Sequence, residues 1–364
     1  MRLPKFYHVS VFIVIALFAN SLALAQSEPD GGSKEILEIQ RTGASYYNRG
    51  EYEKAIAAYK RAIEIDRDST EIYFHLGMAY SSLGKYKEAV EAYTRAVRIK
   101  PDYAAAHYNL GHAYSNLNRH EKAVKAFRQS IRYEPDNVEA YVALANAYFD
   151  SGNQERAFDT FEAAINRWPD NPYAYYRLGL VYFPAGLHAR AADAFTQVIQ
   201  RDARYAEAYF HRAYTYLFLG RGESAARDAE TYISLKGWRA EHSLDMALVS
   251  YFGHLQARQE AAARKVLEEA ALQGDKEMWP YPAIEYLLGK ITALLLYRLA
   301  PDKAEKVEAR AYIGLGLSLQ GDHKAAREHF EWVKSHSASQ PIPFYLVASE
   351  MERMKAVSAV SFKK

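Results

Sequence analysis

The sequence predicts an all-α protein in which helical hairpins stack into a solenoid. Three residue patterns recur every 34 residues, six times each and without an insertion. A small residue recurs at Gly43, Gly77, Gly111, Ala145, Gly179 and Ala213. Tyrosine recurs at Tyr46, Tyr80, Tyr114, Tyr148, Tyr182 and Tyr216, and alanine at Ala55, Ala89, Ala123, Ala157, Ala191 and Ala225. A fixed period of this length is typical of stacked repeat units, so the periodicity itself predicts the fold class.

Each unit is predicted to contain two helices. In the first unit Ala55, Ile56, Tyr59, Ala62 and Ile63 share one helical face. One fixed position of the repeat carries a residue that tolerates the left-handed backbone at the end of a helix, namely Gly50, Gly84, Asn118, Gly152, Gly186 and Gly220. Prolines at the unit boundaries, Pro101, Pro135 and Pro169, cannot continue a helix. We therefore expect a turn inside each unit and a break between units.

The small residues predict close contact between the two helices of a unit. A Gly or Ala on the first helix, facing Ala on the second, lets the axes approach to about 8–10 Å or less. An aromatic side chain follows the repeated alanine by four residues in five units, as Tyr59, Tyr93, Phe127, Phe161 and Phe195, whereas the sixth has Ala229. A single hairpin cannot bury all of its apolar faces, so the units must stack.

These residues resemble the tetratricopeptide repeat (TPR) family. The pattern is clear in residues 70–103, which contain Tyr73, Leu76, Gly77, Tyr80, Ala89, Tyr93, Ala96 and Pro101. The resemblance covers six units over residues 36–239. It implies a right-handed superhelix whose first helices line a concave groove, and a scaffold role, but it does not specify a ligand.

The repeat loses its phase after residue 239. We expect degenerate hairpins and a C-terminal cap over 240–345, beginning with a hairpin at 242–256 and 259–272. A break at Trp279–Pro282 precedes an apolar run predicted to be one helix, Ile284 to Leu299. The pattern returns in a last hairpin, at Gly314, Gly321, Ala326 and Phe330. Residues 346–364 are expected to form a C-terminal tail.

The first 25 residues have the character of an export signal. Arg2 and Lys5 precede an apolar run from Val9 to Ala19, and Ala23-Leu24-Ala25 offers a cleavage site. Residues 26–35 would then be a linker. Together with the lack of an Asn-x-Ser/Thr sequon, this favours an exported, periplasmic protein of a bacterium without membrane insertion after cleavage. The alternative is a chain tethered to the membrane by an uncleaved signal anchor.

Composition excludes several classes of function. There is no cysteine, so disulfides, thiolate metal sites and an N-terminal lipidated cysteine are excluded. Removing Arg2 and Lys5 with the signal leaves 44 of the 46 basic residues, equal to the 44 acidic residues. A neutral chain has no global attraction for nucleic acid. Neither a phosphate-binding Gly-rich loop nor a G-x-S-x-G elbow occurs, and we expect no catalytic residues and no cofactor.

The resemblance implies that positions 2, 5, 9, 12 and 13 of each unit line a peptide-binding groove. The residues selected from these positions are Tyr47, Asn48, Phe74, Tyr108, His112, Asn116, Asn146, Phe149, Tyr173, Tyr176, Phe183, Phe210, Tyr214 and Phe218. Rings bury large areas at low entropic cost, and amides can pair with a ligand backbone. The alternative is that many of these rings only pack between repeats. Because this set contains no Lys or Arg, it does not predict the carboxylate clamp by which some members hold a C-terminus.

Other polar residues have simpler structural explanations. His107, His112 and His120 are close in sequence, but Asn118 is expected to end their helix, so we predict no metal site. Asp228 and Glu230 lie among basic residues and are predicted to be on a solvated helix face.

The leading hypothesis is a non-catalytic scaffold or adaptor of the bacterial cell envelope, which binds a protein or peptide partner of unknown identity in an aromatic groove. One alternative is a self-assembling structural component of a secretion or polysaccharide-export machine, which would form a homo-oligomer. The other is an enzyme with a site in 240–306 around Trp279, where His242, His254 and scattered acids are the available polar groups.

Overall fold

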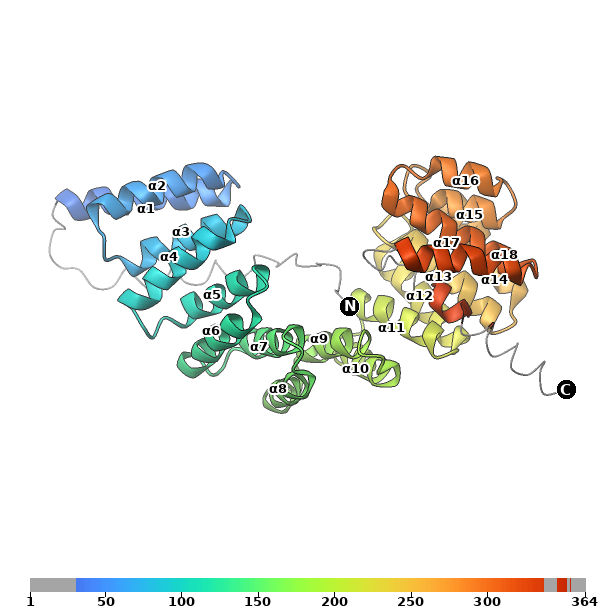
Figure 1. Ribbon diagram of the computed structural model, residues 1–364, viewed down its shortest axis with the longest axis horizontal. Helices are drawn as coiled ribbons and strands as arrows, with labels where there is room; N and C mark the ends of the chain where they lie inside the picture. Colours follow the sequence, from blue (N-terminus) through green and yellow to red (C-terminus); the bar gives the residue numbers. More distant parts are fainter. Residues whose placement is uncertain (1–30, 337–345, 352–353, 355–364) are drawn as a thin grey trace. The chain divides into compact units, whose positions relative to one another are not determined.

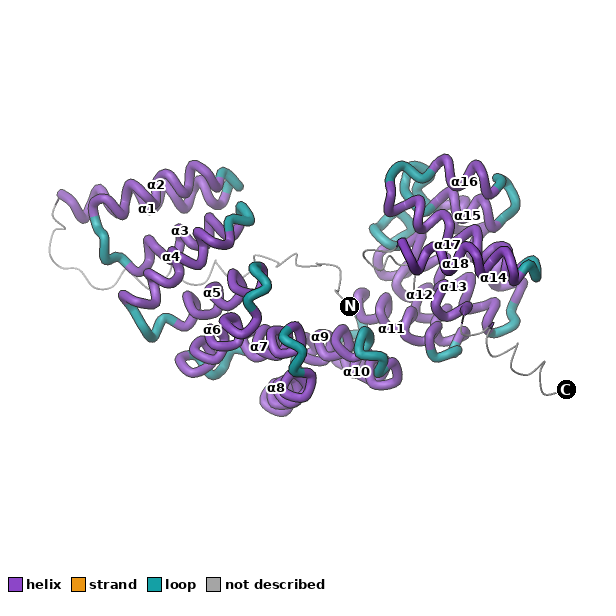
Figure 2. Tube along the Cα trace, viewed as in Figure 1, coloured by secondary structure: helices purple, strands orange, loops and turns teal. Residues whose placement is uncertain are grey.

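A computed structural model describes residues 31–336, 346–351 and 354 of the protein. Every regular element in these ranges is a helix, numbered α1 to α18 in chain order (Figures 1 and 2). The expected export signal lies outside the described residues. Among the described residues, no helix is both long and apolar enough to cross a membrane. The chain divides between Pro169 and Asp170 into two compact units, which we call the N-terminal unit and the C-terminal unit.

The N-terminal unit is a stack of four helical hairpins. They are α1 (Gly31–Asn48) with α2 (Tyr52–Ile65), α3 (Thr70–Ser82) with α4 (Tyr86–Ile99), α5 (Ala104–Asn116) with α6 (His120–Tyr133), and α7 (Val138–Asp150) with α8 (Gln154–Arg167). Each helix packs against the next one in the chain, both within hairpins and between them. The prediction of stacked hairpins is confirmed in this unit.

The C-terminal unit continues the hairpin architecture and adds two short helices. Its hairpins are α9 (Pro172–Tyr182) with α10 (His188–Arg201), α11 (Ala206–Phe218) with α12 (Gly222–Lys236), α13 (Ser243–Gln256) with α14 (Glu260–Gln273), and α17 (Lys303–Leu319) with α18 (His323–His336). The short helices α15 (Tyr281–Leu287) and α16 (Ala293–Leu299) precede the last hairpin. The expected hairpin after residue 240 and the returning hairpin near the end are both confirmed.

The turns inside the hairpins have the backbone that the sequence predicts. All six predicted turn positions have positive φ, from 55° at Asn118 to 86° at Gly152. At Gly84, with φ 71°, the helix end is closed by a bond from the Lys85 amide to the Tyr80 carbonyl, 2.9 Å long. A side chain at Gly84 would meet nothing within 4 Å, so the constraint comes from the backbone angle rather than from crowding.

A small residue packed against a buried ring sets the distance between the helices of a hairpin. A Cβ atom added to Gly77 would lie 2.6 Å from the Tyr93 ring, and one on Gly111 would lie 2.5 Å from Phe127. Tyr93 is only 1% exposed. The last hairpin repeats this contact, with Gly314 against Phe330 at 2.7 Å. The predicted close approach of the helices is therefore present, but the glycine faces the aromatic ring of the second helix rather than its repeated alanine.

A different close contact joins α12 to α13, where the sequence repeat loses its phase. A Cβ atom on Gly222 would lie 2.3 Å from the Gly253 carbonyl oxygen, and one on Gly253 would lie 2.6 Å from the Gly222 carbonyl oxygen. The two helices thus meet backbone to backbone, with no ring between them. The glycines are required on both sides, since a backbone carbonyl cannot rotate away as a side chain can.

Two expectations for the C-terminal region need correction. The predicted single helix from Ile284 to Leu299 is wrong, because the chain turns at Gly289 (φ 74°) and the Lys290 amide closes α15 on the Glu285 carbonyl at 2.8 Å. This is the same closure that ends the first helix of a repeat. The expected tail also starts too early, since Leu346 and Val347 are buried in the core of the C-terminal unit. Residues 355–364 lie outside the described residues.

The glycine pair between α12 and α13 generates a stability prediction. Gly222→Ala should lower the free energy of unfolding by about 1–3 kcal/mol, because the new methyl group overpacks a backbone contact. Urea denaturation measures the effect. Ser224→Ala, in the same helix, is the matched control and should change stability by less than about 0.5 kcal/mol. Alanine favours helices over glycine by about 1 kcal/mol, so a stabilised Gly222→Ala protein would contradict the contact.

Candidate functional site

The residues predicted to line a groove lie on the first helices of the hairpins, and we call their surface the first-helix face. In the N-terminal unit these residues are Tyr47 and Asn48 on α1, Phe74 on α3, Tyr108, His112 and Asn116 on α5, and Asn146 and Phe149 on α7. Asn48 is exposed and the other seven are partly buried. All eight therefore keep some solvent-accessible surface in this unit.

The rings of this face are held by their neighbours. The Tyr108 ring centroid lies 4.5 Å from that of His112 and 5.9 Å from that of Phe127. Phe74 packs in the same way on Tyr93, at 5.9 Å, and on Tyr103, at 5.0 Å. These contacts support the alternative interpretation for part of each ring, which packs inside or between repeats. They also fix the orientation of the ring surface that remains exposed.

The two amides differ from the rings. Asn116 donates from Nδ2 to the His112 carbonyl on its own helix, at 3.0 Å, and its Oδ1 accepts no hydrogen bond from the described residues. The Asn146 side chain makes no hydrogen bond to the described residues and is partly exposed. Polar groups with unused bonding capacity on a solvent-accessible face can pair with the backbone of a bound segment.

In the C-terminal unit the predicted residues lie on α9 and α11 or at their ends, and most pack tightly. The set comprises Tyr173, Tyr176, Phe183, Phe210, Tyr214 and Phe218. Phe183 and Phe218 form one ring cluster with His188, with Phe183 and Phe218 centroids 5.5 Å apart. Tyr176 packs on Tyr205 at 5.0 Å, and burial raises its pKa above the ordinary value.

Tyr214 is not a groove residue. Its side chain is 3% exposed and belongs to the core of the C-terminal unit, together with Tyr312 of α17. The prediction assumed an open face at this position. Here the helices beyond residue 240 contribute side chains to the same core cluster and cover the ring, a contact that the repeat pattern does not encode.

Asp228 is also not on a solvated face. It is 4% exposed and forms a two-pronged ion pair with Arg212, with Nε–Oδ2 and Nη2–Oδ1 distances of 2.7 and 2.8 Å. Arg212 also donates to Thr196 Oγ1 at 2.9 Å, which ties α11 to both α10 and α12. Glu230, by contrast, is exposed as predicted, and it also contacts Ser250 and His254, each at 2.8 Å. A buried pair of this geometry stabilises the unit only while both partners are present.

Sequence reasoning missed two polar pairs in the C-terminal unit, His242 with Asp245 and Trp279 with Glu308. His242 Nδ1 lies 3.2 Å from Asp245 Oδ2, and the Trp279 indole donates to Glu308 Oε2 at 2.6 Å. Burial raises the pKa of Glu308 to about 7, and Asp245 adds to the rise, while the bond from Trp279 opposes it. His242 and Asp245 are one helical turn apart, whereas Trp279 and Glu308 are 29 residues apart, so no spacing pattern signals the second pair.

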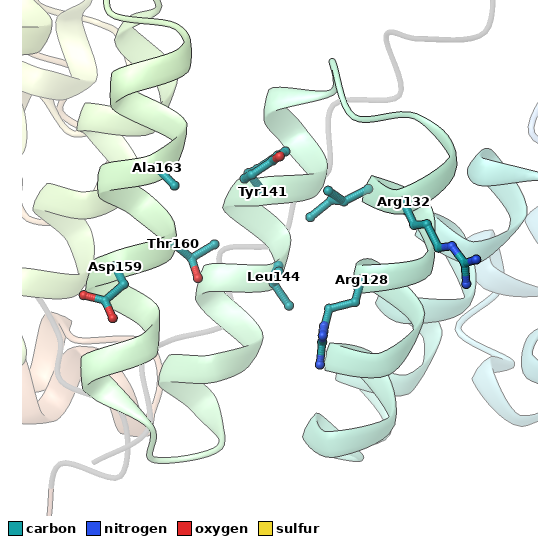
Figure 3. Close-up of a pocket in the computed structure, with 8 residues that line it drawn as sticks. Arg128, Arg132, Tyr141, Leu144, Asp159, Thr160 and Ala163 are labelled. Carbon is teal, nitrogen blue, oxygen red and sulfur yellow. The ribbon is translucent and has the colours of Figure 1, made fainter.

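Metal sites and ligand-sized cavities are scarce among the described residues. No group of three or more His, Asp or Glu residues among them could hold a metal ion. A shallow cavity of about 350 Å³ lies between α6, α7 and α8 in the N-terminal unit (Figure 3). Arg128, Arg132, Tyr141, Leu144 and Asp159 are among its lining residues. This cavity is away from the predicted groove residues, and its two arginines belong to a second helix.

Comparison with known proteins identifies the repeat. Residues 43–84 and 78–118 match the family described as "TPR repeat", and residues 108–172 and 142–204 match "Tetratricopeptide repeat". The chain is a tetratricopeptide repeat protein. Arrays of this family present extended binding surfaces to proteins and generally act as scaffolds without catalysis of their own. The TPR protein is therefore a protein-interaction scaffold, and its partner is a protein or peptide.

Several solved structures are similar to this one, among them two that are described as TPR proteins. A TPR protein from Parabacteroides merdae is 18% identical with a TM-score of 0.51, covering 71% of this chain and 98% of its own. MamA is 27% identical with a TM-score of 0.42, and the match covers 45% of this chain and 96% of MamA. YrrB is described as a TPR protein with an unusual peptide-binding site. It is 20% identical with a TM-score of 0.38, and the match covers 49% of this chain and 92% of YrrB. The match to the Parabacteroides merdae protein supports the fold. No curated protein sequence matches the chain.

The Trp279–Glu308 pair of this TPR protein generates a pH prediction. Glu308 has a pKa of about 7 when folded and an ordinary value near 4.5 when unfolded, so the folded state binds the proton more tightly. Raising the pH from 4.5 to 7 should therefore destabilise the wild type relative to Glu308→Gln, by on the order of 2–3 kcal/mol. Urea denaturation of both proteins across this range measures the difference. A difference that stays constant with pH would show that Glu308 titrates normally.

Proposed function

We propose that this TPR protein is a non-catalytic adaptor of the bacterial cell envelope, which holds a peptide segment or helix of a partner protein on its first-helix face. The observation that carries the proposal is the pair of amides on α5 and α7. Asn116 has an unused acceptor and Asn146 an unused amide, and Asn116 shares α5 with Tyr108 and His112, whose rings contact each other. This combination suits a ligand that offers backbone groups to the amides and apolar side chains to the rings.

Fixed orientation matters for affinity. Association costs free energy when side chains must be ordered on binding, at about 0.5–1.5 kcal/mol for each mobile side chain. Tyr108 and Phe74 are already held by contacts with Phe127 and Tyr103, so their exposed edges bind with little further ordering. A preformed face on stacked helices is suited to an extended or helical segment rather than to a small molecule.

The amides provide the test. Asn116→Ala with Asn146→Ala should weaken partner capture roughly 3- to 10-fold per lost hydrogen bond, because a net bond is worth about 0.5–1.5 kcal/mol. Crosslinked pull-down from the native envelope, quantified against the wild type, measures capture. Asn166→Ala removes an exposed amide from α8, a second helix, and should leave capture unchanged. If the folded double variant captures the same proteins equally well, the binding face is elsewhere.

Export is the part of the proposal that rests on residues 1–25. The basic start, the apolar run and the Ala23-Leu24-Ala25 site support cleavage after Ala25. The protein isolated from its native cell should then begin at Gln26, and intact-mass measurement determines this. A full-length mass in the membrane fraction would instead support the uncleaved anchor.

A further inference from the structure

A short helical segment near the end of the chain packs against the C-terminal unit. Residues 346–351 are helical, and we call them the docked segment. Leu346 and Val347 are 3% and 2% exposed, and they belong to the core cluster that also contains side chains of α11, α13 and α17. The docked segment therefore buries its apolar side chains in this unit.

Three hydrogen bonds show where the docked segment lies. Ser349 Oγ donates to the Leu217 carbonyl at 3.0 Å and accepts from Gln256 Nε2 at 3.1 Å. Ser318 Oγ donates to the Glu350 carboxylate. Leu217, Gln256 and Ser318 are within the last two residues of α11, α13 and α17, respectively. The docked segment therefore crosses the C-terminal ends of three first helices.

These contact points are groove positions of the repeat. Leu217 and Ser318 each follow the small residue of their hairpin by four positions, as the predicted groove residue Tyr47 does in the first repeat. Gln256 precedes the positive-φ residue of its turn by two positions, as Asn116 does. The docked segment thus occupies, in the C-terminal unit, positions at which the resemblance to the TPR family places a bound peptide.

The docked segment leaves one polar atom of this site unsatisfied. Gln256 donates from Nε2 to Ser349 and to the Leu217 carbonyl, at 3.1 and 3.2 Å. Its Oε1 is buried and has no hydrogen-bond partner among the described residues. A buried acceptor without a donor is unfavourable, and most such atoms in native proteins are paired. A different helix that carried a donor at this place would fit the site better than the chain's own segment does.

The docked segment is also held by few side chains. Leu346 and Val347 are buried, whereas the other four residues are only partly buried. A helix of six residues is too short to be stable in water, so this one is helical because it is docked. Its covalent connection to the unit favours docking, since a tethered ligand acts at an effective concentration on the order of millimolar. A free helix has to compete with that concentration.

We propose that the docked segment is an internal ligand of the C-terminal unit, and that a partner helix binds this unit by displacing it. The contacts of the docked segment define the partner: a short amphipathic helix with two adjacent apolar residues and a hydrogen-bond donor three residues after the first of them. This rests on the proposed scaffold function and specifies what the C-terminal unit binds. It also identifies what fills the site when the partner is absent.

A peptide copy of the docked segment tests the site in the full chain. The probe is a fluorescein-labelled peptide of residues 344–356, and fluorescence anisotropy measures its binding. Leu346→Asp with Val347→Asp, which we call the opened variant, removes the apolar anchors of the tethered segment and leaves α11, α13 and α17 unchanged. We expect the opened variant to bind the probe more tightly than the wild type by on the order of tenfold or more, because the tethered competitor is gone.

Matched variants locate the probe at the observed contacts. In the opened variant, Gln256→Ala removes the amide that donates to Ser349 and should weaken probe binding roughly 3- to 10-fold. Gln273→Ala is the control and should have no effect, because Gln273 is exposed and ends α14, a second helix. A probe that carries Leu346→Asp and Val347→Asp should bind neither protein.

A milder variant provides the result if the opened variant is not folded by circular dichroism. Ser349→Ala removes only hydrogen bonds of the docked segment, to the Leu217 carbonyl and from Gln256. It should tighten probe binding roughly 3- to 10-fold over the wild type, because the probe keeps its own serine.

Three results would overturn the internal ligand. They are no probe binding by the folded opened variant, binding no tighter than that of the wild type, and full binding by the opened variant with Gln256→Ala. Such a failure would leave the scaffold proposal standing, because the Asn116 and Asn146 test concerns the N-terminal unit alone. Unchanged capture in that test, together with probe binding by the opened variant, would instead remove only the N-terminal binding face.

Discussion

The contact between a small residue and a buried ring is the constraint on which the hairpins depend. Gly77 against Tyr93 and Gly314 against Phe330 leave no room for a methyl group at either end of the chain. The contact brings the two helices together and closes the core on one side. Because one side of the first helix is then committed to packing, its other side is left for solvent or for a partner. The burial of one side of the first helix therefore determines where the candidate site lies.

The C-terminal unit shows what happens when this contact is replaced. The aromatic position holds Ala229 in the sixth repeat, and the next junction is a backbone contact between Gly222 and Gly253. Further helices then pack around α11, so that Tyr214 is buried and polar residues such as Asp228 and Asp245 are enclosed. Enclosed charges need partners. Arg212 forms an ion pair with Asp228, whereas the hydrogen-bond partner of Glu308 is the neutral Trp279 indole.

The two units therefore offer different chemistry on their first helices. In the N-terminal unit the predicted positions combine partly exposed rings with the amides of Asn116 and Asn146. In the C-terminal unit the rings are largely paired with one another, and carboxylates provide the polar groups.

The sequence by itself determined the hairpins, their turns and the small-residue contacts. These features depend on residues within one 34-residue period, such as Gly84 and Gly77, and local steric rules are sufficient to predict them. The partly buried amides Asn116 and Asn146 lie on first helices, where the repeat pattern placed them. The break at Gly289 could have been recognised, since glycine ends the first helix of a repeat in the same way.

Only the tertiary structure decided which polar residues are buried and which of them meet. Trp279 and Glu308, which share a hydrogen bond, are 29 residues apart, so the 34-residue period does not relate them. Burial depends on which helices cover a position. Tyr214 and Asp228 were predicted to be accessible, but neighbouring helices bury both. Local pattern fixes how a hairpin forms, whereas the charge balance of a buried site depends on neighbours that only packing brings together.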